Sequence, residues 1–235
     1  MVHVGTSGYS YPEWRGSFYP ERFAAARMLP YYAERFDTVE LNSTFYRMPT
    51  ARAVAAWAAQ APPAFLFALK APRRITHEAR LRDVAEPLRA FLDAARGFGP
   101  KLGPLLFQLP PTLRKETGRL GELLALIPPE FRVALEVRHA SWLAEDVYEA
   151  LRDRNAALCI ADTETGTTPA VATADFGYLR LRDRGYAPAA LAGWSRLARR
   201  AEWRDAFIYF KHEESGTGPA LAQALVTQLR AAAAG

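Results

Sequence analysis

The sequence predicts an α/β protein whose strands close into a (β/α)8 barrel of TIM type. Short apolar strands alternate with longer helical segments along the chain, and this alternation implies parallel strands joined by crossover helices. The 235 residues are also close to the roughly 250 that eight such units occupy. The alternative is an open doubly wound sheet, which usually places a GxGxxG turn after its first strand. The GTSG at residues 5–8 does not begin such a turn.

Eight strands are expected, each recognised as a short apolar or alternating run. They span residues 2–6, 38–42, 65–70, 105–109, 133–138, 158–162, 177–182 and 207–211. Apolar residues spaced three and four apart predict helices near residues 28–36, 52–60, 83–96, 119–126, 144–154, 188–200 and 220–233. The stretch from Thr163 to Phe176 has no helical periodicity, so the sixth crossover helix should be rudimentary. No linker-like tract divides the chain, which predicts one domain over residues 1–235.

Alternation within the strands separates an apolar face from a polar one. Helices should cover the apolar faces, so the polar faces are expected to point into the barrel. Polar side chains on these faces or strand ends are Glu40, Asn42, Lys70, Gln108, Glu136, Arg138, Asp162, Arg180, Arg182 and Lys211. Most of them lie near the carboxyl ends of their strands, where barrel enzymes carry their active sites.

Composition limits the class of protein. Half of the residues are apolar and 23% are charged, as in ordinary globular proteins. No apolar run approaches the roughly 18 residues of a membrane-spanning helix, and the first residues do not form a secretory signal. The single cysteine, Cys159, lies in an expected buried strand, which is typical of a reducing compartment. The expectation is a soluble cytoplasmic protein without a membrane partner.

The expected interior carries more positive than negative charge. Five cations (Lys70, Arg138, Arg180, Arg182 and Lys211) face three carboxylates (Glu40, Glu136 and Asp162), an excess of two. A water-poor cavity with such an excess should hold a phosphate or carboxylate. The alternative is a buried ion-pair network with a purely structural role. The net charge of +5 contains no block of five basic residues, so it supports an anionic partner only in general terms.

Three residues are candidates for catalysis. Lys70, surrounded by cations, should lose its proton easily and serve as a general base or an imine-forming amine. Glu136 beside Arg138 should stay ionised and orient a hydroxyl or act as a base. Asp162 is the third candidate. The expected ligand-binding residues are Glu40, Asn42, Gln108, Arg138, Trp142, Arg180, Arg182 and Lys211.

No metal centre or cofactor is expected. The chain has four histidines and lacks HExxH, paired cysteines and His-x-His. His139 and His212 follow the fifth and eighth strands, so a site joining them to Asp162 is the alternative. The glycines of the loop at residues 213–219 either approach a phosphate or simply begin a helix.

Aromatic residues gather in the first loop. Tyr9, Tyr11, Trp14, Phe18 and Tyr19 lie within eleven residues of one another. On a loop at the site end they either stack on a ring or nucleobase or pack as a lid, and the lid is favoured.

These segments together resemble the domain of unknown function family 72, the YecE-like proteins. The matching stretches are GTSGYSYPEWRG (5–16), FYP (18–20), TVELNSTFY (38–46), LKA (69–71), GPLLFQLPP (103–111), EVRH (136–139) with Trp142, and AD (161–162). The resemblance implies a TIM-type barrel and does not imply a particular activity. The chain departs from the family pattern after the seventh strand, at LRDRGY (181–186), and at Lys211-His212, where it is more basic.

The functional prediction is an anion site at the carboxyl end of the barrel, with metal-independent acid/base chemistry of a hydrolase, lyase or isomerase. The alternative is a noncatalytic nucleic-acid-binding protein that uses the basic rim and the aromatic residues. The sequence carries no signal for the oligomeric state or for the identity of the substrate.

Overall fold

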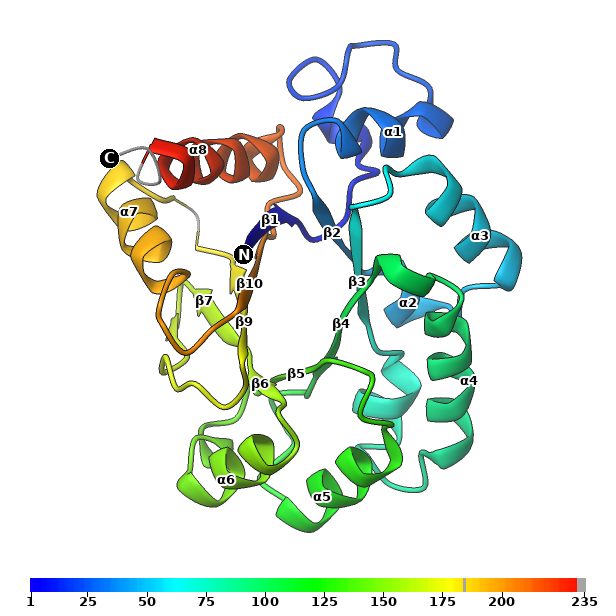
Figure 1. The fold of residues 1–235 in the computed structure, drawn as a ribbon, viewed down its shortest axis with the longest axis vertical. Coiled ribbons are helices and arrows are strands. Elements are labelled where there is room, and N and C mark those ends of the chain that lie inside the picture. The colour runs from blue at the N-terminus through cyan, green and yellow to red at the C-terminus, as the bar shows by residue number, and fades with distance from the viewer. Residues whose placement is uncertain (184, 232–235) are drawn as a thin grey trace.

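The structure is a computed structural model that describes residues 1–183 and 185–231 (Figure 1). The strands are β1 (Val2–Thr6), β2 (Thr38–Leu41), β3 (Leu66–Lys70), β4 (Leu102–Gln108), β5 (Val133–Glu136), β6 (Ala157–Leu158), β7 (Ile160–Thr163), β8 (Gly166–Thr167), β9 (Phe176–Leu181) and β10 (Asp205–Phe210). The α-helices are α1 (Met28–Ala33), α2 (Ser43–Tyr46), α3 (Ala51–Gln60), α4 (Ala85–Arg96), α5 (Thr117–Leu126), α6 (Glu145–Asp153), α7 (Pro188–Leu197) and α8 (Thr217–Ala231). Shorter helical turns are η1 (Pro12–Trp14), η2 (Ala25–Arg27), η3 (Arg74–Glu78), η4 (Gly99–Lys101) and η5 (Ala140–Trp142).

The predicted elements are present with small shifts at their ends. The sixth strand is divided into β6 and β7 at Cys159, which is buried as expected. Helix α2 and the π-helical turn η3 were not predicted. Residues 232–233 of the predicted last helix lie outside the described residues. None of the helices in the described part of the chain has the length and hydrophobicity required to cross a lipid bilayer.

The strands form two five-stranded sheets, in the orders β1-β10-β9-β7-β8 and β2-β3-β4-β5-β6. The pairing is parallel throughout, except between β7 and β8. The prediction of parallel strands with crossover helices is therefore confirmed. The predicted closure is not shown, because the ladder of the described strands divides into two sheets and does not continue around a ring.

The two sheets nevertheless face one another around a common centre, with helices on the outside (Figure 1). At one junction a single bridge pairs Ser7 with Glu40, and the Gly8 amide donates to the Glu40 carbonyl at 2.8 Å. Close by, the Thr38 and Tyr209 hydroxyls are 2.8 Å apart. At the other junction β6 of one sheet contacts β9 of the second. The sheets are thus neighbours at both edges.

The helices bury one stripe each against the outer face of a sheet. In α4 the buried residues Leu88, Phe91, Leu92 and Ala95 recur at three- and four-residue spacing. Helix α3 begins at Thr50, whose hydroxyl accepts a hydrogen bond from the Ala53 amide at 3.2 Å. These local signals explain why the helix positions were predictable.

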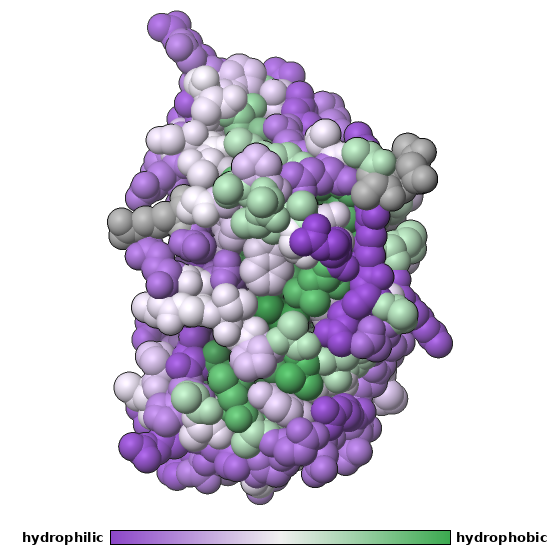
Figure 2. Space-filling view, turned by 90° about the vertical axis from the view of Figure 1, so that its left-hand side faces the viewer, coloured by the Kyte–Doolittle hydropathy of each residue, from purple (hydrophilic) through white to green (hydrophobic). Residues whose placement is uncertain are grey.

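The sixth crossover contains no helix. Between Thr163 and Phe176 the chain forms the short strand β8, which folds back antiparallel on β7. This agrees with the expected rudimentary crossover. Figure 2 shows the corresponding side of the molecule, where apolar surface is visible between hydrophilic side chains.

Two apolar clusters lie on opposite faces of the strands; the alternation predicted the one beneath the helices, whereas the other occupies part of the inner face that was expected to be polar. Val39, Leu41 and Phe107 belong to the larger cluster, which lies between the sheets and the helices. The smaller cluster fills the space between the sheets and consists of Ala68, Leu106, Ala134, Ala157, Cys159, Phe176, Tyr178, Phe207 and Tyr209. The charged residues described below lie on this inner face, toward the carboxyl ends of the strands.

Candidate functional site

A buried ion-pair network crosses the space between the sheets. Arg180, on β9, donates to the Oε2 of Glu136, on β5, at 2.5 Å and to the Oε1 of Glu40, on β2, at 2.8 Å. The exposed fractions are 1% for the arginine and 0% for both glutamates. The predicted convergence of inward-facing charges from strands far apart in the sequence is confirmed for these three residues.

Glu40 has partners on both carboxylate oxygens. The Ser7 hydroxyl donates to Oε1 at 2.7 Å, alongside Arg180, and the Tyr178 hydroxyl donates to Oε2 at 2.7 Å. Ser7 was not among the predicted site residues, because the first strand shows no polar alternation. Tyr178 shares the face of Arg180, so strand alternation was the signal that pointed to it.

Glu136 is held by three donors. Besides Arg180, the Gln108 amide donates to Oε1 at 3.0 Å, and the Arg138 guanidinium pairs with the same oxygen. Burial raises the pKa of Glu136, but the charges of Arg180 and Arg138 outweigh it and hold the pKa at about 2. This direction agrees with the expectation that the carboxylate stays ionised. With so low a pKa it is a weak base, so it serves chiefly as a fixed negative charge.

Lys70, at the end of β3, differs from the arginines in having no carboxylate partner. It is only 8% exposed, and its Nζ lies 4.0 Å from the centre of the Phe45 ring. No carboxylate of the described residues lies within 4.0 Å of this nitrogen. Burial, together with the nearby Arg180 charge, lowers the pKa of Lys70 to about 8. The direction agrees with the expected easier loss of the proton, but burial, and not the surrounding cations, is its largest cause.

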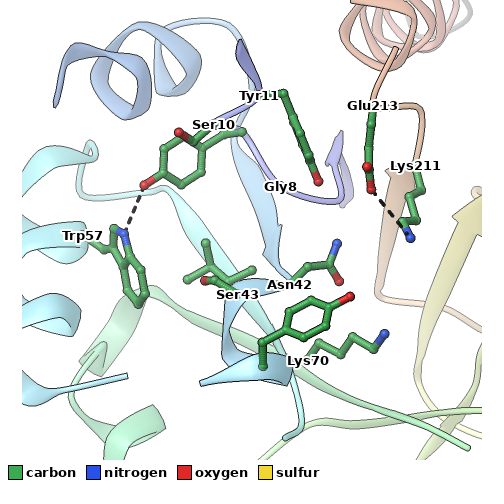
Figure 3. A pocket seen from close by; sticks show the side chains of 12 residues that line it. Gly8, Ser10, Tyr11, Asn42, Ser43, Trp57, Lys70, Lys211 and Glu213 are labelled. Carbon is green, nitrogen blue, oxygen red and sulfur yellow. Dashed lines mark hydrogen bonds and ion pairs between the residues drawn. The ribbon is translucent and has the colours of Figure 1, made fainter. Parts of the chain in front are cut away.

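Lys70 lines a cavity of about 490 Å³ where β1, β2, β3 and β10 end (Figure 3). The lining residues are Gly8, Tyr9, Ser10, Tyr11, Leu41, Asn42, Ser43, Tyr46, Trp57, Lys70, Lys211 and Glu213. Neither polar atom of the buried Asn42 amide makes a hydrogen bond within the described residues. The Tyr11 hydroxyl lies beside this amide but donates its own proton to the Ser7 carbonyl at 2.7 Å. The cavity therefore presents an ammonium without a carboxylate partner among the described residues, and an amide whose polar neighbour is the Tyr11 hydroxyl.

Lys211 and Glu213 form the wall on the side of β10. The Lys211 Nζ is 3.8 Å from the Glu213 Oε1, and Figure 3 shows the pair beside the cavity. Burial, with the Arg182 and Arg180 charges, lowers the pKa of Lys211. A second hollow of about 640 Å³ shares this pair and is otherwise lined by Glu164, Arg182, His212, Glu214 and Thr217. Lys70, Asn42 and Lys211 are thus brought to one cavity, and Arg182 to the hollow beside it.

Two predicted site residues, Asp162 and Trp142, belong neither to the ion-pair network nor to the linings of the cavity and the hollow. The Asp162 carboxylate accepts hydrogen bonds from the Thr167 hydroxyl and, at 2.7 Å, from the Tyr186 hydroxyl, so it holds the β7–β8 hairpin. Trp142 is fully buried, and its indole N–H donates to the Leu113 carbonyl at 2.8 Å. The expectation that Trp142 contacts a ligand does not fit this position, because the side chain packs the turn η5 beneath the surface.

The glycines of the last loop have packing roles. A Cβ on Gly218 would lie 2.8 Å from the His212 carbonyl oxygen, and one on Gly216 would lie 2.3 Å from the Ser17 hydroxyl. Gly216 also has a φ of +72°, a conformation that glycine adopts without strain. Close backbone approach therefore accounts for both residues. Among the described residues, no three His, Cys, Asp or Glu side chains are grouped so that they could hold a metal ion.

The aromatic residues of the first loop divide into two groups. Trp14 and Tyr19 are each only 1% exposed, which agrees with packing in a lid. Tyr9 and Tyr11 line the cavity, and the Tyr9 hydroxyl accepts a hydrogen bond from the Trp57 indole at 3.1 Å. Trp57, on α3, was not anticipated, because helical periodicity alone does not show that a side chain reaches the site.

Comparison with known proteins decides the family. The family described as "Protein of unknown function DUF72" matches residues 3–235. The chain belongs to the DUF72 family. Two curated relatives of this DUF72 protein are the UPF0759 protein YecE of Escherichia coli K12, 31% identical over 155 residues, and the UPF0759 protein YunF of Bacillus subtilis 168, 29% identical over 157 residues. These matches cover 66% and 63% of this chain, but they span only 54% and 55% of the relatives.

Solved DUF72 structures have the same fold. A DUF72 family protein from Thermotoga maritima superimposes with a TM-score of 0.85 and 26% identity, covering 98% of this chain and 99% of that one. A DUF72 family protein from Enterococcus faecalis has a TM-score of 0.82 at 19% identity, covering 98% and 96%. The family resemblance predicted from the sequence motifs is therefore confirmed over nearly the whole chain.

Proposed function

We propose that this DUF72 protein binds a small anion, bearing a phosphate or a carboxylate, in the 490 Å³ cavity. The observation that carries the proposal is the buried ammonium of Lys70, which lines this cavity without a carboxylate partner among the described residues. A buried charge without a counterion is costly, and an anionic ligand would supply the missing partner.

The distribution of charge supports the same proposal. Two arginines, Arg138 and Arg180, offset the two carboxylates of Glu40 and Glu136. The cavity itself is lined by two lysines, Lys70 and Lys211, and by one carboxylate, Glu213, so one positive charge is in excess. The buried amide of Asn42 adds a donor and an acceptor that can orient a polar ligand.

The chemistry we assign to the site is acid/base catalysis without a metal. An amine with a pKa of about 8 exchanges its proton readily near neutral pH, so Lys70 is the acid/base residue. Glu136 supplies a fixed negative charge beneath it. Asp162 acts indirectly: its carboxylate accepts hydrogen bonds from Thr167 and Tyr186 and so fixes the β7–β8 hairpin at the rim of the site.

We also propose that the strands of the two sheets form a closed (β/α)8 barrel. Supporting it are the Ser7–Glu40 bridge at one junction and the donation of the Cys159 amide to the Leu135 carbonyl at 2.9 Å near the other. Arg180 also ties β9 to strands of the other sheet. A barrel brings all the strand ends to one mouth, which is where the cavity lies.

The test is ligand-induced thermal stabilisation with four anions: inorganic phosphate, glycerol 3-phosphate, lactate and malate. Charge-assisted hydrogen bonds are worth about 1.5–3 kcal/mol, so Lys70→Met should weaken binding roughly 10- to 150-fold. Lys115→Met is the matched control, because Lys115 pairs with Asp146 on the surface, and it should bind like the wild type. If none of the four anions raises the melting temperature, the proposal is wrong.

One observation favours the nucleic-acid alternative: Tyr46, at the rim of the cavity, is 75% exposed and free to stack on a base. Single-stranded DNA binding would then fall steeply with salt and would be lost in Tyr46→Ala. Retention of anion binding in Tyr46→Ala, without any affinity for single-stranded DNA, would favour the small-molecule site.

A further inference from the structure

We propose that Lys70 forms an imine with the carbonyl group of an anionic ketone or aldehyde bound in the cavity. This inference rests on the proposed anion site and specifies its substrate class: a small molecule that carries both a carbonyl carbon and a carboxylate or phosphate. The other charged groups of the cavity would bind the anionic end, while the Lys70 amine reacts with the carbonyl.

The surroundings of Lys70 suit a nucleophilic amine. Lys70 has no carboxylate within 4.0 Å among the described residues, and its nitrogen lies 4.0 Å from the centre of the Phe45 ring. Burial and the Arg180 charge outweigh the more distant Glu40 and Glu136 carboxylates and favour the free amine. Lys70 stands at the carboxyl end of β3, where the strand is buried, and its side chain lines the cavity of about 490 Å³. This volume suits a small metabolite. The nitrogen is therefore sheltered from bulk water but accessible to a ligand.

Lys211, the second lysine of the cavity, is positioned to bind the anionic group of the ligand. Lys211 comes from the end of β10, and its Nζ lies 3.8 Å from the Glu213 Oε1, a carboxylate that offsets part of the lowering of the Lys211 pKa by burial and by the arginine charges. The two lysines also interact electrostatically, because the Lys211 charge makes Lys70 easier to deprotonate. Lys211 and Asn42 would hold the carboxylate or phosphate, and Lys70 would meet the carbonyl carbon.

The reaction balances without an oxidant, a reductant or a cofactor. The Lys70 ammonium loses one proton to water. The free amine attacks the carbonyl carbon, a C–N bond forms, and the amine's proton passes to the carbonyl oxygen, which becomes a hydroxyl. Return of the first proton to that hydroxyl releases a water molecule. The product is a protonated imine that keeps the single positive charge of the original ammonium.

The lowered pKa of Lys70 makes the first step, loss of its proton, accessible near neutral pH. With a pKa of about 8, roughly a quarter of the Lys70 side chains carry a free amine at pH 7.5. For an ordinary lysine, such as one on the surface, the fraction is about 0.1%. The difference of about two orders of magnitude predicts that adducts form at Lys70 well before they form at an ordinary lysine.

The experiment is trapping with sodium cyanoborohydride, which reduces an imine to a stable secondary amine. The full chain is incubated with pyruvate or, separately, with dihydroxyacetone phosphate, and the two probes distinguish a carboxylate from a phosphate ligand. Only four lysines are present, Lys70, Lys101, Lys115 and Lys211, so peptide mass spectrometry locates any adduct directly. We expect one adduct per chain, at Lys70, at least tenfold above either surface lysine.

Three controls make the result decisive. Lys70→Met should abolish the adduct, whereas Lys211→Met should leave its position at Lys70 and lower its yield. Acetone, which has the carbonyl but no charge, should label Lys70 at least tenfold less than the anionic probes. If Lys70→Met does not fold, the position of the adduct in the wild type still decides the question.

Lactate and glycerol 3-phosphate carry an anionic group but no ketone or aldehyde, so they test the anion site separately from the imine. If they raise the melting temperature but neither carbonyl probe labels Lys70, the imine is wrong and the anion site stands. If neither these anions nor the carbonyl probes bind, both proposals fail. Equal labelling of all four lysines would also overturn the imine, because it would show ordinary solution reactivity.

Discussion

Replacing Arg180 by methionine tests whether the buried network stabilises the fold. The guanidinium is 1% exposed and is the bridge between Glu40 and Glu136, both completely buried. Removing one partner of a buried ion pair costs about 3–5 kcal/mol, because the other charge is left uncompensated. Here two carboxylates lose a partner, although Arg138 still pairs with Glu136. We therefore expect a loss of about 4 kcal/mol, a large share of a typical stability of 5–15 kcal/mol.

The loss is measured as the free energy of unfolding in urea at pH 7, followed by circular dichroism. The control is Arg152→Met, since Arg152 pairs with Glu145 at 2.5 Å on the surface, with side chains 42% and 64% exposed. An exposed pair is worth about 0–1 kcal/mol, so the control should unfold almost like the wild type. The reasoning is refuted if Arg180→Met and Arg152→Met lie within 1 kcal/mol of each other.

Three further predictions concern single groups. Because the folded-state pKa of Glu136 is about 2, below its ordinary 4.5, its contribution to stability is complete above pH 4.5 and is lost as the pH falls toward 2. The free energy of unfolding in urea should drop by about 2 kcal/mol between pH 5 and pH 2.5 in the wild type and by less in Glu136→Gln, and equal profiles of the two proteins would contradict this. The pKa of Lys70 is lowered from 10.5 to about 8, so the unfolded state binds more protons than the folded state between these pH values. The wild type should therefore gain stability as the pH rises from 8 to 10.5, and Lys70→Met should lack this part of the gain. A variant profile identical to that of the wild type would count against a buried ammonium. Trp142→Phe removes the hydrogen bond to the Leu113 carbonyl and should cost about 1 kcal/mol in thermal unfolding without altering anion affinity, whereas a tenfold weaker affinity would place Trp142 in the binding site after all.

The inner network was predictable because strands impose a strict alternation. Once Glu40, Glu136 and Arg180 are assigned to strands, each must share the face opposite its apolar neighbours, and two facing sheets bring those faces together. No knowledge of distances was needed. The same rule explains why the apolar residues of the inner cluster and the charges above it follow one another along each strand.

The rim was less predictable because loops have no period. Asp162 has the expected position on its strand, but the return of β8 brings Thr167 to its carboxylate. Trp142 follows β5, and the turn η5 directs its ring into the core. Phe45 reaches Lys70 only because the unpredicted helix α2 carries it there. These outcomes depend on local backbone conformations that no alternation in the sequence encodes.

The two interpretations of the interior charges, structural network and ligand site, apply to different residues. Glu40 and Glu136 have partners on every carboxylate oxygen, so a ligand could add nothing to them without breaking a bond already made. Lys70 and Asn42 are different: the buried Lys70 side chain has no carboxylate within 4.0 Å among the described residues, and the amide atoms of Asn42 are buried without a hydrogen bond of normal geometry. Leaving such a group unsatisfied costs about 1–3 kcal/mol, and a leucine at either position would avoid that cost. A fold that keeps both groups on the wall of one cavity is better explained by a ligand that satisfies them than by stability.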